Sequence, residues 1–151
     1  MSNSNKTIIK IISIAFCALL AAGTAYGDSS KTIIKHRQGV MEAIGGHFGA
    51  AFSTMKGMDQ FSGNQQFHAE SIARLAKISV ETFPAGSGKG KTKALPAIWE
   101  QPEVFKAAMD EFLLNADAFA VASTKDMATY GAAAQALGKS CKNCHDDFKD
   151  K

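Results

Sequence analysis

Apolar residues recur at helical spacing along most of the chain beyond residue 30. In the segment from about Lys31 to Phe52 they fall on one face, as a period of 3.6 residues requires. A second helix is expected from about Asn64 to Phe83, because Pro84 and the glycines after it end the pattern. The first of these two seams consists of Ile33, Ile34, Met41, Ile44, Phe48, Ala51 and Met55.

Two further helices are expected in the second half of the chain. Pro96 and Trp99 occupy the approach to the third, and Pro102 fits its first turn. The apolar residues of this third helix recur at spacings of three and four, at Phe105, Ala108, Phe112, Ala116 and Phe119. Ser123 or Thr124 can cap the fourth, which extends to Phe148. The apolar stripe of this fourth helix repeats at intervals of seven residues and comprises Met127, Tyr130, Ala134, Leu137, Cys141, Cys144 and Phe148.

No segment shows the alternation of a strand, and the connections 53–63 and 84–101 are long enough to reverse the chain direction. The pattern therefore predicts an all-α fold, an antiparallel four-helix bundle. In such a bundle a cofactor can lie between facing helices.

The N-terminus has the organisation of a secretory signal peptide. A positively charged start precedes an apolar run of thirteen residues, Ile11 to Gly23, and Ala25-Tyr26-Gly27 has small residues where a signal peptidase cleaves. The run is shorter than the ~20 residues that a membrane span needs. We expect a signal peptide over residues 1–27 with cleavage after Gly27, one mature domain over residues 28–151 without a membrane span, and a periplasmic location.

Charge excludes one class of partner. The chain has 17 Lys and Arg against 14 Asp and Glu, but Lys6 and Lys10 leave with the signal peptide, which reduces the formal charge from +3 to +1. Nothing in this balance predicts nucleic-acid binding. Cys17 lies inside the apolar run and is lost as well, so the mature chain has two cysteines, Cys141 and Cys144.

Those two cysteines lie in the pentapeptide Cys141-Lys142-Asn143-Cys144-His145. This spacing is the one that attaches a haem covalently, because two thiols add to the two vinyl groups of a porphyrin and the adjacent imidazole reaches the iron. In a helix all three side chains leave one face. One covalently bound haem c per chain is predicted, held in the core of the bundle.

Two other interpretations of the cysteines are weaker. A redox-active dithiol normally follows a strand at the start of a helix, and no strand is predicted near residue 141, although a structural disulfide or dithiol stays open. A tetrahedral zinc site needs a fourth ligand beyond His145, and His36, His47 and His68 all lie far upstream.

Arg37 falls within the apolar seam of the first helix, where its charge needs a partner. A haem propionate would supply one, and a side chain that snorkels past the core to water would not need one. The sequence leaves both possibilities open.

The mature chain resembles the class II c-type cytochromes, the cytochrome c′ family and its low-spin relatives. The residues that carry the resemblance are Arg37-Gln38-Gly39-Val40-Met41, His47-Phe48-Gly49, Pro96-Ala97-Ile98-Trp99, and Cys141 to His145 followed by Phe148. The resemblance implies thioether bonds from Cys141 and Cys144, His145 as proximal iron ligand, and Met41 on the distal side of the iron. Lys149 departs from the family pattern, because several cytochromes c′ have an arginine there.

Met41 leaves two functions open. In low-spin members a methionine here ligates the iron, and this soft ligand raises the reduction potential of an electron carrier. In cytochromes c′ the residue only packs over an open site, as a methionine in a core commonly does. The first hypothesis is single-electron transfer through a His145/Met41-ligated iron, and the alternative is a five-coordinate cytochrome c′ that binds NO or CO.

Other expectations concern competing ligands and partners. His47 and His68 could ligate the iron in place of Met41, but each is interpreted as a surface or supporting residue. Redox proteins are the expected partners, and homodimer formation through the first two helices is common in the family. No distal arginine and histidine pair of the peroxidase kind is recognised, so no enzyme activity is predicted.

Overall fold

The structure is a computed structural model that describes residues 4–56 and 59–151, with side chains placed for 29–56 and 60–151. The signal peptide expected over residues 1–27 lies outside the residues whose side chains are described. The elements in chain order are α1 (Ser4–Met55), the 3-10 helix η1 (Asp59–Asn64), α2 (Gln65–Val80), α3 (Ala97–Glu100), α4 (Pro102–Ala122) and α5 (Met127–Phe148).

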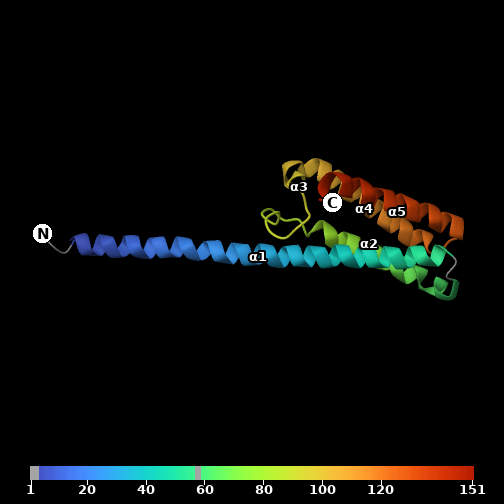
Figure 1. The fold of residues 1–151 in the computed structure, drawn as a ribbon, viewed down its shortest axis with the longest axis horizontal. Helices are drawn as coiled ribbons and strands as arrows, with labels where there is room; N and C mark the ends of the chain where they lie inside the picture. Colours follow the sequence, from blue (N-terminus) through green and yellow to red (C-terminus); the bar gives the residue numbers. More distant parts are fainter. Residues whose placement is uncertain (1–3, 57–58) are drawn as a thin grey trace.

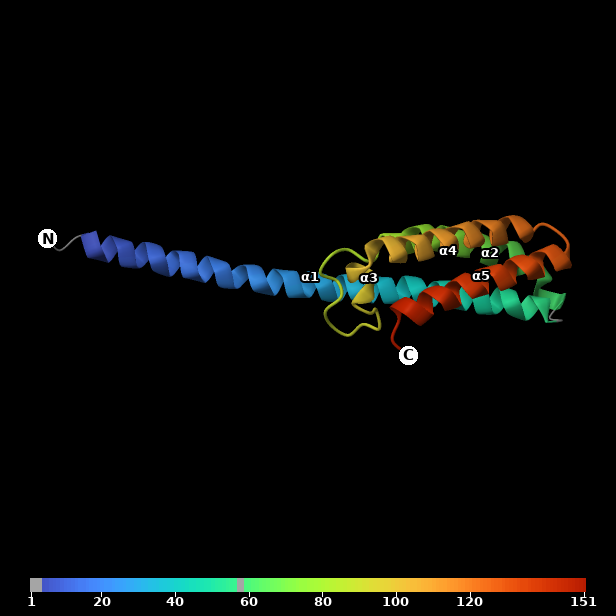
Figure 2. The same ribbon diagram turned by 90° about the horizontal axis from the view of Figure 1, so that it is seen from above.

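The four long helices form the predicted bundle. Figure 1 shows α4 and α5 lying over α1 and α2, and Figure 2 shows the same layers from above. Helix α1 packs on α2, α2 on α4 and α4 on α5, whereas α1 and α5 touch each other much less. The prediction of an all-α four-helix bundle is confirmed, and it has one thinly packed side between α1 and α5.

Most of the core is made of residues that the helical periodicity selected, but Met127, predicted on the apolar stripe of the fourth helix, is 50% exposed at the start of α5. In α4, Pro102 occupies the first turn as predicted, and Met109, Phe112, Ala116 and Phe119 are buried at spacings of three and four. Burial of one such phenylalanine stabilises the fold by about 1.5–3 kcal/mol. The Phe119 ring stacks on Tyr130 of α5 with centroids 4.7 Å apart, which joins α4 to α5.

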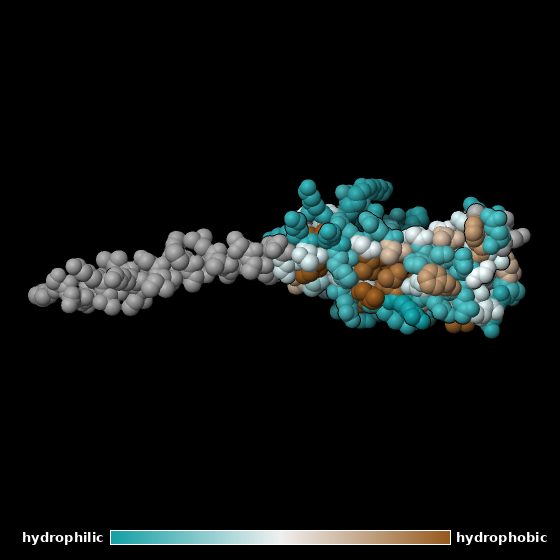
Figure 3. Space-filling view, turned by 90° about the horizontal axis from the view of Figure 1, so that it is seen from below, coloured by the Kyte–Doolittle hydropathy of each residue, from teal (hydrophilic) through white to brown (hydrophobic). Residues whose placement is uncertain are grey.

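Apolar side chains also reach the surface, as the brown areas among the polar surface of Figure 3 show. Most of the exposed large ones occur on α1, α2 and α4, and these include Phe52, Phe67, Ile78, Val104, Leu114 and Val121. In the described part of the chain, none of the helices combines the length and the apolar character that crossing a bilayer requires.

The start of α5 differs from the prediction. Asp126 is the N-cap, and its carboxylate accepts hydrogen bonds from the backbone N–H and the hydroxyl of Thr129. Ser123 and Thr124, the predicted caps, instead donate their hydroxyls back to the carbonyls of Ala120 and Val121. Those hydroxyls satisfy carbonyls at the end of α4, so they are not available to α5.

The second helix ends earlier than predicted, at Val80, and is followed by a loop through residues 81–96. Thr82 lies beyond the helix, where its hydroxyl donates to the carbonyl of Ser79. Pro96 is the N-cap of the four-residue helix α3, so the expected approach to the third helix is itself helical. Asn64 occupies the predicted cap position of α2, but its side chain makes no capping hydrogen bond.

Arg37 of α1 holds the loop in place. Its Nη1 donates to the carbonyl oxygen of Thr82 (3.1 Å) and to Oγ of Ser87 (3.0 Å), and its Nη2 donates to the carbonyl of Ser87 and to Oγ1 of Thr92, both at 3.0 Å. The guanidinium also lies over the rings of Phe83 and Trp99. One side chain from α1 thus donates to four oxygens of the loop, two of which are the backbone carbonyls of Thr82 and Ser87.

The end of α5 is tied to the same loop. The backbone N–H of Leu95 donates to the carbonyl of Phe148 at 3.0 Å, and that of Asp150 donates to the carbonyl of Lys93 at 2.8 Å. These bonds form an isolated antiparallel bridge between Ala94 and Lys149. The haem motif is therefore followed directly by a fixed point of the fold.

Candidate haem site

Helix α5 places Cys141, Cys144 and His145 on one side of its penultimate turns. Cys144 and His145 follow Cys141 by three and four positions, so the three side chains leave the helix close together. Both thiols are free, half-buried and packed against the edge of the hydrophobic core. His145 is exposed at the same end of the helix. This arrangement is the one that two thioether bonds and an axial imidazole require.

The surroundings of the two thiols keep them protonated. Burial raises the pKa of Cys141, and it raises that of Cys144 to about 11, with further contributions from Cys141 and Asp147. A redox-active pair needs at least one thiol with a lowered pKa. The structure therefore gives no support to the dithiol interpretation.

The imidazole of His145 is held in its neutral form. Partial desolvation of the ring and then the charge of Lys149 lower the pKa of His145. A neutral imidazole is the form that ligates iron. On the outer side of the same turn, Lys142 and Asp146 form an ion pair in water, which contributes little to stability.

The thiols and His145 border the side of the bundle where α1 and α5 touch least. We call this side the α1–α5 seam and define it by Met41 and Phe48 on α1 and by Gly138, Cys141 and His145 on α5. Phe48 closes one end, because its Cζ lies 3.5 Å from the position that a Cβ on Gly138 would occupy. Met41 is half-buried against the same core.

The register of the two helices brings Met41 and His145 to the same level. Helices α1 and α5 run in opposite directions (Figures 1 and 2). Met41 lies seven residues before Phe48, and His145 lies seven residues after Gly138, each a step of about 10 Å along its helix. Residues seven apart share a helix face. Because the two helices are antiparallel, seven residues back along α1 and seven residues forward along α5 lead in the same direction from the Phe48–Gly138 contact. Met41 therefore lies across the seam from His145.

The residues of the seam fit a haem. Two free thiols and an imidazole lie on α5, and the apolar side chain of Met41 faces them from α1. Helices α1 and α5 make few contacts with each other. Within the described residues, no group of three or more histidine, cysteine and carboxylate side chains converges on a common point, so the zinc interpretation lacks its ligands.

Arg37, one turn before Met41, is buried and only 3% exposed, so the snorkelling interpretation is wrong. Burial lowers its pKa below the ordinary value, and its four hydrogen-bond partners are all neutral oxygens. Its pairing with a haem propionate stays a prediction. His47 and His68 hydrogen-bond to each other between α1 and α2.

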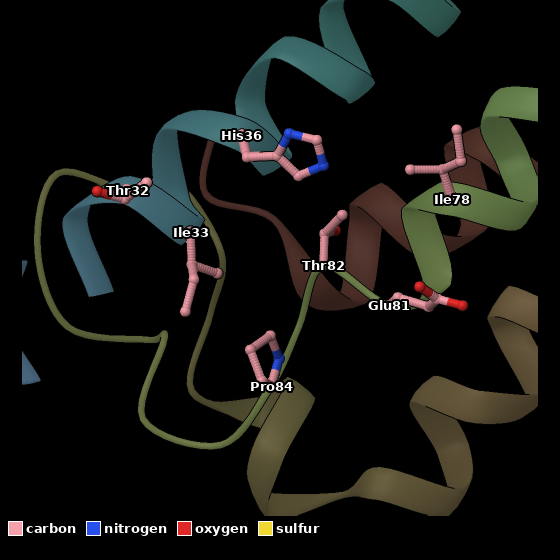
Figure 4. Close-up of a pocket in the computed structure, with 7 residues that line it drawn as sticks. All are labelled: Thr32, Ile33, His36, Ile78, Glu81, Thr82 and Pro84. Carbon is pink, nitrogen blue, oxygen red and sulfur yellow. The ribbon is translucent and has the colours of Figure 1, made fainter. Parts of the chain in front are cut away.

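A surface hollow of about 350 Å³ lies elsewhere, between the first turns of the packed part of α1 and the end of α2 (Figure 4). Its lining residues are Thr32, Ile33, His36, Ile78, Glu81, Thr82 and Pro84. None of them belongs to the seam or to the haem motif. The hollow is therefore not the place where the motif would hold a porphyrin.

Sequence reasoning did not recognise Phe48 and Gly138 as parts of the site. A glycine one turn before Cys141, in a helix otherwise rich in alanine, was the available signal, because such a glycine often marks a close approach of another element. The partners of Arg37 carried no such signal, since Thr82, Ser87 and Thr92 are common loop residues.

Comparison with known proteins agrees with this site. A family model described as Cytochrome C′ matches residues 32–149. A cytochrome c′ of Rubrivivax gelatinosus is 37% identical over 123 residues, which cover 78% of this chain and 94% of the relative. A cytochrome c-556 of Agrobacterium fabrum is 34% identical over 133 residues, which cover 87% and 88% respectively.

A solved structure has the same fold. It is a nitric oxide complex of a variant of cytochrome c′ from Alcaligenes xylosoxidans, with a TM-score of 0.74 and 27% identity, and the match covers 81% of this chain and 97% of that one. Members of the family carry covalently bound haem c, as the pentapeptide predicted. The chain therefore belongs to the cytochrome c′ family and is a monohaem c-type cytochrome.

Proposed function

We propose that this cytochrome binds a diatomic ligand such as NO or CO on the distal side of a five-coordinate haem, with Met41 lining that side. This places first the function that the sequence alone placed second. The register of the α1–α5 seam supports a role for Met41 on the distal side under either function, and the packing of its side chain against the buried core favours a lining role over ligation. A side chain held in that packing forms an apolar wall over the distal face.

The relatives support this order. The matching family model and the relative from Rubrivivax gelatinosus are named cytochrome c′, and the similar structure from Alcaligenes xylosoxidans is a nitric oxide complex. When bound, haem c supplies an iron centre that exchanges one electron or takes up one small ligand.

The chain's own residues have separate tasks in this proposal. Cys141 and Cys144 would hold the porphyrin through thioethers, and His145 would supply a neutral imidazole to its iron. Arg37 fixes the loop of residues 81–96 beside the seam. The thin packing of α1 against α5 gives the porphyrin room without opening the rest of the core.

The absorption spectrum of the purified holoprotein tests the proposal. We expect high-spin bands in both oxidation states and a shift of the ferrous bands when CO or NO is added. A matched variant, Met41→Leu, keeps the size of the side chain but removes the sulfur. It should leave the spin state unchanged. A low-spin spectrum with a sulfur-to-iron charge-transfer band would contradict the proposal.

That contrary result defines the second candidate, a single-electron carrier whose iron is ligated by His145 and Met41. It is favoured by the chemistry of Met41, whose thioether lies level with His145 and is a soft ligand. Similarity to a cytochrome c-556 is consistent with it. Under this function Met41→Leu would convert a low-spin spectrum to a high-spin one.

We also propose that the chain is exported to the periplasm after cleavage at Gly27 and loaded there with its haem. The basic start, the thirteen-residue apolar run and the small residues before Asp28 support cleavage. Intact-mass measurement of the periplasmic protein should give a chain starting at Asp28 plus one haem. A mass that retains residues 1–27 would contradict the export proposal while leaving the haem site intact.

A further inference from the structure

A pair of histidine side chains lies outside the seam, where α1 packs on α2. His47 of α1 and His68 of α2 approach each other with their Nδ1 atoms 2.9 Å apart. Both side chains are half-buried, so water and ions reach them. The two residues are separated by twenty-one positions in the chain, and it is the packing of α1 on α2 that brings the two nitrogens together.

Phe67 helps to fix the orientation of both rings. Its ring meets His47 edge-on with centroids 5.7 Å apart and meets His68 with centroids 5.5 Å apart. The two imidazole centroids are 5.2 Å apart, and their planes are inclined by 56°. Phe67 is itself 63% exposed, so it flanks the pair at the surface and does not seal it.

The short distance requires that the pair share one proton. One Nδ1 must donate and the other must accept, because two protonated nitrogens would repel each other. The accepting Nδ1 has a free lone pair in this arrangement, and a ring nitrogen with a free lone pair is the form that binds metal ions.

The separation of the two nitrogens lets both reach one ion. Two nitrogens bound at about 2.0 Å lie about 2.8–3.3 Å apart in square-planar and tetrahedral sites, and the observed separation of 2.9 Å falls within this range. At nitrogen ligands the affinity of divalent first-row metal ions is greatest for Cu²⁺ and lower for Zn²⁺.

We propose that His47 and His68 bind a divalent late transition metal ion, Cu²⁺ in preference to Zn²⁺, at a site separate from the haem. The ion takes the place of the shared proton between the Nδ1 atoms, and that proton moves through solvent to Nε2 of the same ring, so both imidazoles stay neutral. Water fills the remaining positions, because in the described part of the chain no third histidine, cysteine or carboxylate joins the pair.

The bound ion would cross-link α1 to α2. An ion that binds only the folded chain stabilises it in proportion to the logarithm of its concentration over its dissociation constant. The ligands come from two helices, so either one alone binds the ion more weakly than the pair by the effective concentration of the second. These two consequences can be measured separately.

The test is a titration of the haem-loaded mature protein with Cu²⁺, followed by electron paramagnetic resonance and by thermal unfolding. We expect one equivalent to bind with nitrogen hyperfine coupling, to raise the unfolding midpoint, and to leave the haem absorption unchanged. His47→Ala and the conservative His68→Gln should each weaken Cu²⁺ binding by about tenfold or more and abolish the rise in midpoint. His36→Ala, which removes an exposed histidine from the same helix, is the matched control and should change neither.

Equal Cu²⁺ affinity in His47→Ala and the unaltered protein would overturn the proposal, as would a loss of binding in His36→Ala. A change in haem absorption at one equivalent would place the ion at the haem and also overturn it. Formation of dimers on addition of Cu²⁺, measured by light scattering, would contradict a site built within one chain. Tighter binding of Zn²⁺ than of Cu²⁺ would overturn the proposed preference for Cu²⁺.

Discussion

Arg37 and Met41 are one turn apart on α1, yet their surroundings differ in kind. Arg37 is 3% exposed, and its two terminal nitrogens donate to four oxygens of the loop that follows α2. Met41 is half-buried on the α1–α5 seam, where the two helices touch little. The same helix therefore fixes a loop at one turn and leaves space at the next.

The comparison contrasts a loop that needs a side chain to hold it with a side of the bundle that does not. The loop of residues 81–96 has no regular structure over most of its length, and its buried carbonyls depend on a side chain from α1. The seam is bounded by α1 and α5, whose backbone groups are paired within each helix and need no such support. Few contacts between these two helices therefore leave their secondary structure intact. A cofactor can occupy the seam because the neighbouring end of the bundle is already held.

The largest effect is expected from removing the hydrogen bonds that Arg37 donates to the loop of residues 81–96. Arg37→Met keeps an unbranched apolar stem but leaves the carbonyls of Thr82 and Ser87 without their donor, which should lower the free energy of unfolding by about 3 kcal/mol or more. Urea unfolding of the holoprotein measures this change. Arg74→Met, at an exposed position of α2, is the control and should change it by less than about 0.5 kcal/mol. Equal losses in the two variants would show that the loop does not depend on Arg37.

A smaller loss is expected within the loop itself. A Cβ added at Gly88 would lie 2.7 Å from Cζ3 of Trp99, closer than real Cβ contacts come. The Trp99 indole is held because its N–H donates to the carbonyls of Phe83 and Pro84. Gly88→Ala should therefore destabilise by about 1–3 kcal/mol, measured as a fall in the urea midpoint. An unchanged midpoint would mean that the indole moves freely and that this end is less rigid than argued.

The opposite sign is expected on the seam. A Cβ at Gly138 would meet only the ring of Phe48, with Cζ at 3.5 Å and Cε1 at 3.9 Å, both ordinary contact distances. Alanine favours a helix over glycine, so Gly138→Ala should stabilise the protein by about 0.5–1 kcal/mol with its haem spectrum unchanged. Gly88→Ala and Gly138→Ala each add one methyl group, so the two changes in unfolding free energy compare the loop directly with the seam. A destabilised Gly138→Ala protein would show that the seam is packed as tightly as the loop.

The smallest effect is expected at the start of α5, the helix that carries Cys141 and Cys144. Hydrogen bonds from the Thr129 backbone and hydroxyl lower the pKa of Asp126 below its ordinary value of 3.8. Its contribution is therefore complete above that value and is lost as the pH falls through the lowered one. Asp126→Ala should reduce the unfolding midpoint at pH 7, and the difference should shrink below about pH 4. Thr124→Ala is the control, since its hydroxyl does not cap α5; a difference that persists in acid would contradict the capping role.

Much of the fold was predictable because helical periodicity is a local signal. Phe112, Ala116 and Phe119 were recognisable from their spacing alone, and they are buried. The cap of α5 was not, because Ser123, Thr124 and Asp126 are all good caps. The choice among them depends on which backbone groups at the end of α4 also need partners.

The candidate site divides in the same way. Cys141, Cys144 and His145 are a local motif, and the sequence alone pointed to haem. The position of Met41 level with His145 depends on the Phe48–Gly138 contact between helices far apart in the chain. The partners of Arg37 lie forty-five to fifty-five positions away, and no periodicity reports them.

The thin packing between α1 and α5 also has a consequence for the order of folding. Contacts of α1 with α2 and of α4 with α5 join helices that are adjacent along the chain, so they form with little loss of loop entropy. Bringing α1 to α5 closes almost the whole domain into one loop for few direct contacts. A porphyrin bonded to α5 and facing α1 would supply the contacts that this last closure lacks, so haem attachment would also complete folding.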